Sequence, residues 1–191
     1  MPQATRTLIT ACVAVFVAQI FLRNVPLEAF ALWPLGNGFL PWQLVTYAFL
    51  HGSVAHIFFN MFALFMFGSE IERLFGTRWF TIYYFVCVIA AGITQLVVNA
   101  MLGSGAPTVG ASGGVFGLLL AFAMYFPQRK LYLIFFPIGL PAWLFVTLYG
   151  ALELYLGVTQ TASGIAHFAH LGGMIGGYLM IQQRRGRRGR R

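Results

Sequence analysis

The sequence predicts an all-α, polytopic membrane protein with a bundle of six transmembrane helices. Of its 191 residues, 59% are hydrophobic and only 8% are charged, whereas soluble globular proteins carry about 25% charged residues. The hydrophobic residues are gathered into runs that can cross a hydrocarbon core, which takes about 20 helical residues. Charged segments and Gly/Pro-rich segments separate these runs. We expect the runs to form one domain over residues 1–191.

Six apolar runs account for most of the chain, and each is expected to form one spanning helix. The most charged interior stretch, GSEIERLFGTR (68–78), separates the second run from the third. The loop LGSGAPTVG (102–110) and the segment PQRK (127–130) end the third and fourth runs. The first run lacks a small-residue cleavage site, so we interpret it as a retained helix and not as a signal peptide. The predicted spans are 7–23, 53–69, 79–100, 111–127, 131–149 and 163–183.

The basic residues predict how this bundle is oriented. Six of the twelve Lys and Arg residues lie in RRGRRGRR, within a predicted basic tail over 183–191. An even number of spans places both termini on one side, and that side then collects every basic residue except Arg23. The positive-inside rule assigns it to the cytoplasm. We therefore expect a multi-pass protein of the cytoplasmic (inner) membrane, with a tail that contacts anionic lipids and no nucleic-acid partner.

The segment 24–52 is too long and too apolar for an ordinary connection between spans. It carries Trp33, Trp42 and Tyr47, and such aromatic residues favour a membrane interface. We expect an element that is partly embedded in the outer leaflet. The predicted outer face also receives the loops 101–110 and 150–162.

Few ionisable residues are placed to act inside the membrane. The absence of certain residue types from the sequence excludes two classes of protease. The chain has no aspartate, so it lacks the carboxylate pair of an aspartyl protease. It also has no His-Glu-x-x-His sequence, which removes the ligands and base of a zinc hydrolase of that type. All four glutamates fall in predicted loops or at span ends. We expect no metal and no other cofactor.

Ser112 and His170 are the candidate nucleophile and general base. The fourth span has about 15 residues from Ser112 to its inner end, or roughly 22 Å. In a hydrocarbon core of about 30 Å, Ser112 then lies roughly 8 Å below the outer boundary. His170, seven residues into the sixth span, lies roughly 10 Å down by the same rise. The two side chains share a depth and can meet in a site that opens to the outer face.

Neighbouring residues supply the other parts that such chemistry needs. His56 and Asn60 are four residues apart and project from one face of the second span. They offer a ring N–H and an amide to an oxyanion, and the Ser112 backbone amide lies at a helix N-terminus where donors are free. Gly173 and Gly177 let another helix approach beneath His170. Since no acid is positioned to orient His170, the expected arrangement is a Ser-His dyad. His51 and His167 are interpreted as interfacial or structural.

Four segments at these positions resemble the rhomboid family of intramembrane serine proteases, in the bacterial six-span form. They are HGSVAHIFFN (51–60), GSEIERLFG (68–76), GASGG (110–114) and AHLGGMIGG (169–177), in the family's order and at its approximate spacing. The resemblance implies a membrane-embedded first loop over 24–52 and an outer loop, 150–162, that caps the site. It also implies that substrates are transmembrane segments of other membrane proteins.

The resemblance assigns a role to each matching residue. It implies Ser112 as the nucleophile and His170 as the base, with the oxyanion bound by His56, Asn60 and the backbone around Ser112. Gly110 is then the glycine two positions before the nucleophile. Phe116 stands where the family has a tyrosine that stacks on the catalytic histidine, so stacking is kept and any hydroxyl contact is lost.

Two rival functions come from other classes. A non-catalytic rhomboid-like protein could use the same cavity to bind transmembrane clients, and it would tolerate Ser112→Ala. A channel or transporter could line a polar path with His56, His167 and His170. The transporter requires polar residues on the cytoplasmic side as well, yet the inner halves of the second, fourth and sixth spans are nearly all apolar residues and glycine.

Overall fold

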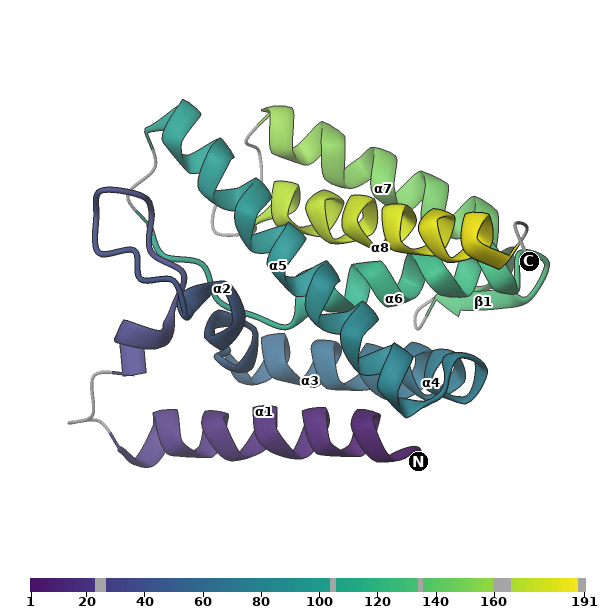
Figure 1. Ribbon diagram of the computed structural model, residues 1–191, viewed down its shortest axis with the longest axis horizontal. Coiled ribbons are helices and arrows are strands. Elements are labelled where there is room, and N and C mark those ends of the chain that lie inside the picture. Colours follow the sequence, from purple (N-terminus) through teal and green to yellow (C-terminus); the bar gives the residue numbers. More distant parts are fainter. Residues whose placement is uncertain (23–26, 104–105, 134–135, 160–165, 189–191) are drawn as a thin grey trace.

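A computed structural model gives the structure of the chain and describes residues 1–22, 27–103, 106–133, 136–159 and 166–188. Helices make up most of the described chain, and the first and last described residues lie at the same end of the bundle (Figure 1). In Figure 1, α1 and α7 form opposite edges, and α5, α6 and α8 lie between them. The helices that correspond to the predicted spans are α1 (Gln3–Phe21), α3 (Val54–Ala63) with η3 (Leu64–Gly68) and α4 (Ser69–Phe75), α5 (Thr77–Leu102), α6 (Ser112–Tyr125), α7 (Ala142–Thr159) and α8 (His167–Arg188).

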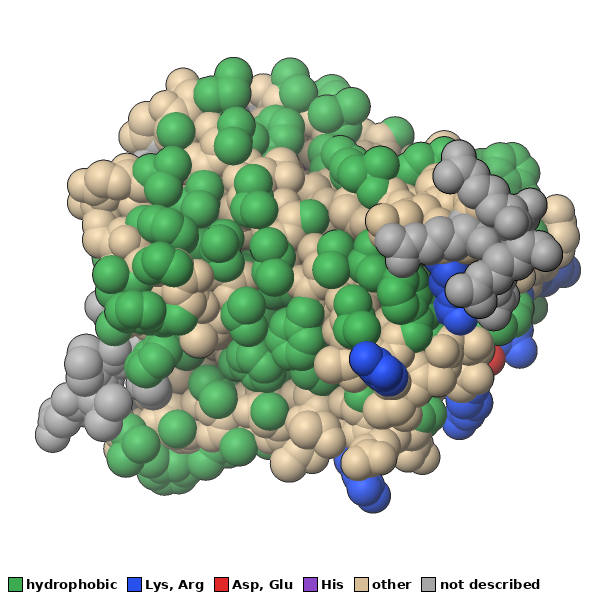
Figure 2. Space-filling view, viewed as in Figure 1, with side chains coloured by type: hydrophobic (Ala, Val, Ile, Leu, Met, Phe, Trp, Pro, Cys, Tyr) green, Lys and Arg blue, Asp and Glu red, His purple; other side chains and the backbone are tan. Residues whose placement is uncertain are grey.

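The helices have the length and surface of a membrane bundle. Among the described residues, four helical segments are long and apolar enough to cross a membrane, namely Gln3–Phe21, Val54–Phe75, Thr77–Leu102 and Ala142–Thr159, and α6 is a shorter apolar helix. Hydrophobic side chains are spread across the face shown in Figure 2, and the Lys and Arg side chains visible there lie in the half of the view that holds the start of α1 and the end of α8. The predicted fold class, an all-α polytopic membrane bundle, is therefore confirmed. The protein is a multi-pass membrane protein.

The predicted fifth span, 131–149, is wrong in its position. An antiparallel hairpin occupies its first half, formed by β1 (Lys130–Leu133) and β2 (Phe136–Pro141) with Lys130 opposite Pro141. The helix of this region, α7, begins only at Ala142. Gly139 and Pro141 are poor helix formers, so an apolar run that hydropathy cannot distinguish from a span turns back as a hairpin. The predicted outer loop 150–162 is helical to Thr159, and 160–162 lie outside the described residues.

The predicted second span, 53–69, ends too early. The helix continues from α3 through the π-helical η3 into α4 and ends at Phe75. Gly76 has φ +77°, a conformation that glycine adopts at low cost, and it separates α4 from α5. The charged residues of α4 are accommodated because Glu70 forms ion pairs with Arg73 at 2.7 Å and with Arg129 at 2.8 Å.

Glu72 on α4 caps the N-terminus of α1. Its carboxylate accepts hydrogen bonds from the backbone N–H groups of Ala4 at 2.9 Å and Thr5 at 2.7 Å. The hydroxyls of Thr5 and Thr77 donate to it as well, at 2.7 and 2.9 Å. The first N–H groups of a helix have no partner within the helix, and the helix dipole favours a negative charge there. Glu72 therefore joins α1 to α4 and α5 at the end of the bundle that holds the N-terminus.

Replacing Glu72 with alanine is expected to lower the free energy of unfolding by about 2–4 kcal/mol, because it leaves buried donors without an acceptor. Unfolding in detergent, followed by circular dichroism, measures the change. Glu70→Ala removes two largely exposed ion pairs, with Arg73 and Arg129, and is expected to cost less than about 1 kcal/mol. Equal losses in the two variants would contradict the capping role of Glu72.

One buried glutamine, Gln43, holds together the described part of the long first loop through hydrogen bonds to its backbone. The loop contains η1 (Leu27–Phe30), α2 (Gln43–Thr46) and η2 (Tyr47–Phe49). The Gln43 amide nitrogen donates to the carbonyls of Ala29 and Gly38, and its oxygen accepts from the N–H groups of Trp33 and Leu40. The membrane embedding of this loop stays a prediction.

The aromatic residues of this loop do not share one environment. Trp42 is 51% exposed, as an interfacial side chain would be. Tyr47 is only 2% exposed, and its hydroxyl donates to the Val88 carbonyl of α5 at 2.8 Å. The predicted interfacial position of Tyr47 is therefore wrong, because this side chain is part of the core.

Glycines let α8 pack closely against α6 and α5. A Cβ atom at Gly173 would overlap the carbonyl oxygen of Gly113 on α6. A Cβ atom at Gly177 would overlap the Tyr83 hydroxyl of α5, which donates to the Gly117 carbonyl of α6 at 2.7 Å. Gly173 therefore faces the fourth span, as its small-residue pattern predicts, whereas Gly177 faces the third.

Candidate active site

Ser112 is the first residue of α6, and the loop before it is held by backbone hydrogen bonds. Thr108 pairs with Leu32 in an isolated antiparallel bridge, and the Gly110 N–H donates to the Tyr47 carbonyl at 2.9 Å. Gly110 has φ +126°, which a side chain would strain. A Cβ atom there would also lie 2.7 Å from the His56 Nε2 atom. The turn thus needs glycine for its conformation and for the space that the imidazole occupies.

The Ser112 hydroxyl contacts the His170 imidazole. The Ser112 Oγ lies 2.8 Å from the Nε2 atom of His170, and His170 is buried in the first turn of α8. Phe116, one turn after Ser112, stacks on the same imidazole with ring centroids 4.2 Å apart and an interplanar angle of 5°. Phe116, which stands where the rhomboid family has a tyrosine, therefore keeps an aromatic ring stacked on His170.

Glu153 lies beside His170, although the sequence places all glutamates in loops or at span ends. Its Oε2 atom is 2.8 Å from the Nδ1 atom of His170 and 2.7 Å from the Nδ1 atom of His167. The expectation that no acid is positioned to orient His170 is wrong. The cause is the displaced fifth span: because α7 runs over 142–159, Glu153 lies within a helix and not in an outer loop. A prediction that starts the fifth helix after Pro141 would have placed Glu153 inside that helix, where it can reach His170.

Glu153, His167 and His170 also have the side-chain types of a metal site. One ligand atom from each lies within 4.8 Å of the others, and His and Glu are ligands that Zn²⁺ accepts. The two Nδ1 atoms are, however, both at hydrogen-bonding distance from the same carboxylate oxygen. Two N–H donors account for this geometry without a cation. The absence of a bound metal stays a prediction.

His56 is oriented with its Nε2 atom toward the loop that carries Ser112. Its Nδ1 atom accepts a hydrogen bond from the Gly52 N–H at 3.3 Å, so a neutral imidazole carries its proton on Nε2. That atom lies beside Gly110, two residues before Ser112. The ring of His51, a fully buried residue, packs against the His56 ring with centroids 5.1 Å apart. The structural interpretation of His51 agrees with this packing.

Asn60 is buried one turn after His56 on α3. Its side-chain amide donates to the His56 backbone carbonyl at 2.9 Å. An amide nitrogen has two hydrogens, and this bond uses one of them. Asn60 can therefore stay bonded to its helix and still donate to a bound oxyanion.

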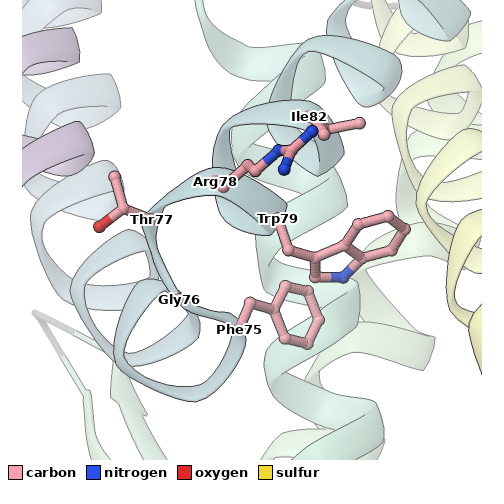
Figure 3. Close-up of a pocket in the computed structure, with 6 residues that line it drawn as sticks. All are labelled: Phe75, Gly76, Thr77, Arg78, Trp79 and Ile82. Atoms are coloured by element: carbon pink, nitrogen blue, oxygen red, sulfur yellow. The ribbon is translucent and has the colours of Figure 1, made fainter.

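A surface hollow at the turn between α4 and α5 has a different character. Its lining includes Phe75, Trp79 and Ile82, and in Figure 3 the two aromatic side chains point toward each other while Arg78 points away from them. The Arg184 guanidinium lies over the Phe75 and Trp79 rings at 5.1 and 5.0 Å. The start of the predicted basic tail, 183–188, is thus the last part of α8, and Arg184 packs on the bundle. This hollow is separate from Ser112 and His170.

Comparison with known proteins identifies the relatives of this chain. Residues 39–185, which include Ser112, His170, His56 and Asn60, match the Rhomboid domain family. The chain is 34% identical over 138 residues to Rhomboid protease GluP of Bacillus subtilis, covering 72% of this chain and 25% of that protein. It is 34% identical over 145 residues to the mitochondrial RHOMBOID-like protein 12 of Arabidopsis thaliana, and this alignment covers 68% of this chain and 42% of that protein.

A longer alignment relates the chain to Rhomboid protease GlpG of Yersinia pseudotuberculosis. The identity is 28% over 178 residues, which cover 92% of this chain and 60% of that protein. The alignments therefore span between 25% and 60% of the length of these relatives.

Proposed function

Because the chain belongs to the rhomboid family, we propose that it is an intramembrane serine endopeptidase that cleaves transmembrane segments of other membrane proteins. One observation carries the proposal: the Ser112 hydroxyl is hydrogen-bonded to the His170 imidazole at 2.8 Å at the start of α6. A serine and a histidine in this contact are the nucleophile and base of acyl-transfer chemistry. The relatives that are named rhomboid proteases support the same activity.

In the proposed mechanism, His170 Nε2 takes the proton of Ser112 as the Oγ atom attacks a peptide carbonyl of the substrate. The negative charge on the tetrahedral intermediate is stabilised by backbone N–H groups at the start of α6 and by donors from His56 and Asn60. His170 then gives the proton to the leaving amine, which leaves an acyl-enzyme on Ser112. Water, deprotonated by the same imidazole, hydrolyses this ester and restores the hydroxyl.

The substrate segment has to unwind before this attack. Carbonyl groups within a helix are hydrogen-bonded and shielded by the turns around them, so Ser112 cannot reach them. Segments that contain glycine, proline or other helix-breaking residues should therefore be cleaved faster than uniform leucine segments. The position of the basic side chains near both termini (Figure 2) supports cytoplasmic termini in an inner membrane, with the site open to the outer face.

Covalent labelling tests the proposed function directly. A fluorophosphonate probe is expected to form a single adduct, and mass spectrometry of the digested protein is expected to place it on Ser112. The same preparation in liposomes should cleave a model single-span substrate, and labelled protein should lose that activity. Heat-unfolded protein is the control and should not react. An adduct on another serine, or full cleavage by labelled protein, would refute the assignment.

A further inference from the structure

We propose that Glu153 is a positioning residue for His170, so that the site works as a Ser112–His170–Glu153 triad and not as a dyad. This inference rests on the proposed function. It concerns a residue from α7, a helix that contributes no other group to the proposed chemistry. His167 is assigned a supporting role as the second hydrogen-bond donor to the same carboxylate.

The hydrogen bonds at both nitrogens of His170 determine which of them carries the proton. An ionised carboxylate is an acceptor only, so its 2.8 Å contact makes Nδ1 of His170 the donor. In the neutral ring, Nε2 must then be the acceptor, and it faces the Ser112 hydroxyl at 2.8 Å. This is the tautomer that a general base requires. Without an acceptor at Nδ1, the proton could reside on Nε2 and the ring could no longer take one from Ser112.

The charge of Glu153 has a second effect during the reaction. When His170 takes the Ser112 proton it becomes an imidazolium ion, and an isolated cation at this depth in a membrane is costly. The Glu153 carboxylate is in contact with the ring and is 4% exposed, so solvent screens their attraction poorly. The positive charge that develops in the transition state is thereby stabilised where it forms.

The packing of α7 on α8 holds Glu153 in place. Gly157, one turn after Glu153, lets the ring of Phe168 approach, since a Cβ atom there would lie 3.0 Å from it. His167 Nδ1 contacts the same Oε2 atom as His170 Nδ1, at 2.7 Å. The carboxylate is therefore fixed by two donors from successive turns of one helix. A carboxylate held this way orients the imidazole with little rotational freedom.

A purely structural tie between α7 and α8 would use the same contacts, so the test needs readouts that separate the two roles. Glu153→Gln keeps the size of the side chain and removes its charge, and its amide can donate to Nδ1 and favour the unproductive tautomer. We expect the rate of fluorophosphonate labelling and kcat to fall on the order of 100-fold. KM and the unfolding temperature should stay close to those of wild type. Glu153→Asp, which restores the charge, should recover part of the loss.

Glu70→Gln is the matched control, because it makes the same substitution on the exposed side of α4, and it should label and cleave like wild type. Glu153→Gln with wild-type labelling would overturn the inference, as would a loss confined to KM or to stability. Treatment with a chelator should leave wild-type activity unchanged. A loss that Zn²⁺ restores would assign the cluster to a metal and overturn the triad.

Nuclear magnetic resonance of the protein with 15N-labelled histidine makes the test independent of activity. Wild type should show His170 protonated on Nδ1, and Glu153→Gln should shift that population toward Nε2. An unchanged tautomer in the variant would overturn the inference even where cleavage is slow. A wild-type protein that shows the Nδ1 tautomer but neither labels nor cleaves would refute the proposed function and leave the assigned contact intact.

Discussion

Replacing Ser112 with alanine is expected to reduce cleavage of a single-span substrate to background, at least about 10³-fold below wild type. The reason is that the variant has no oxygen at the position that lies 2.8 Å from the His170 Nε2 atom. His170→Ala should lose a similar factor, because the hydroxyl then has no base. The double variant should be no worse than either single one, since the two groups act as a unit. Cleavage in liposomes with purified substrate measures all three.

Ser69→Ala is the matched control for these variants. Ser69 is also buried, but it lies on α4 in another part of the bundle, so its substitution should leave cleavage unchanged. Undiminished cleavage in Ser112→Ala or His170→Ala would rule out the proposed pair. If wild type and Ser112→Ala bind transmembrane clients equally and neither cleaves them, the non-catalytic binding function is the correct one.

Replacing Gly173 with alanine is expected to lose both stability and activity. The added Cβ atom would overlap the Gly113 carbonyl oxygen, and a backbone group on a packed helix cannot move aside as a flexible side chain can. Overpacking of this kind costs about 3 kcal/mol. It also pushes α8 away from α6 close to the Ser112–His170 contact, and a displacement of about 1 Å at a reacting pair costs on the order of 100-fold in rate. Thermal unfolding in detergent and liposome cleavage measure the two effects.

Gly186→Ala provides the comparison for this substitution. Gly186 lies near the end of α8, and a Cβ atom there would meet no other atom within 4 Å, so the variant should match or slightly exceed wild type in stability. A Gly173→Ala protein with wild-type unfolding and cleavage would show that close contact between α6 and α8 is not required.

The order of the apolar helices along the chain could be predicted from the sequence because hydropathy depends on composition over about 20 residues. The limits of α1, α5 and α6 differ from prediction by only a few residues. The same method placed the fifth span wrongly, because it averages over the apolar hairpin at 130–141 and the helix that follows. Hydropathy also ended the second span at residue 69, because it assigns charged residues to loops. The charged residues of α4 stay in the helix because they form ion pairs and hydrogen bonds there.

The proposed nucleophile, base and oxyanion donors could be named from the sequence because each belongs to a local motif whose spacing is visible along the chain. Glu153 could not, since no motif surrounds it. Its contact with His170 depends on where α7 begins and on how closely Gly157 lets α7 approach α8.

The sequence by itself determined that this protein is a membrane bundle and which short segments resemble a serine protease, because both properties are carried by neighbouring residues. Only the tertiary structure decided that the Glu153 carboxylate contacts His170 and that Tyr47 lies in the core. Those positions result from side chains on different helices meeting in space, and no pattern within a single segment specifies such a meeting.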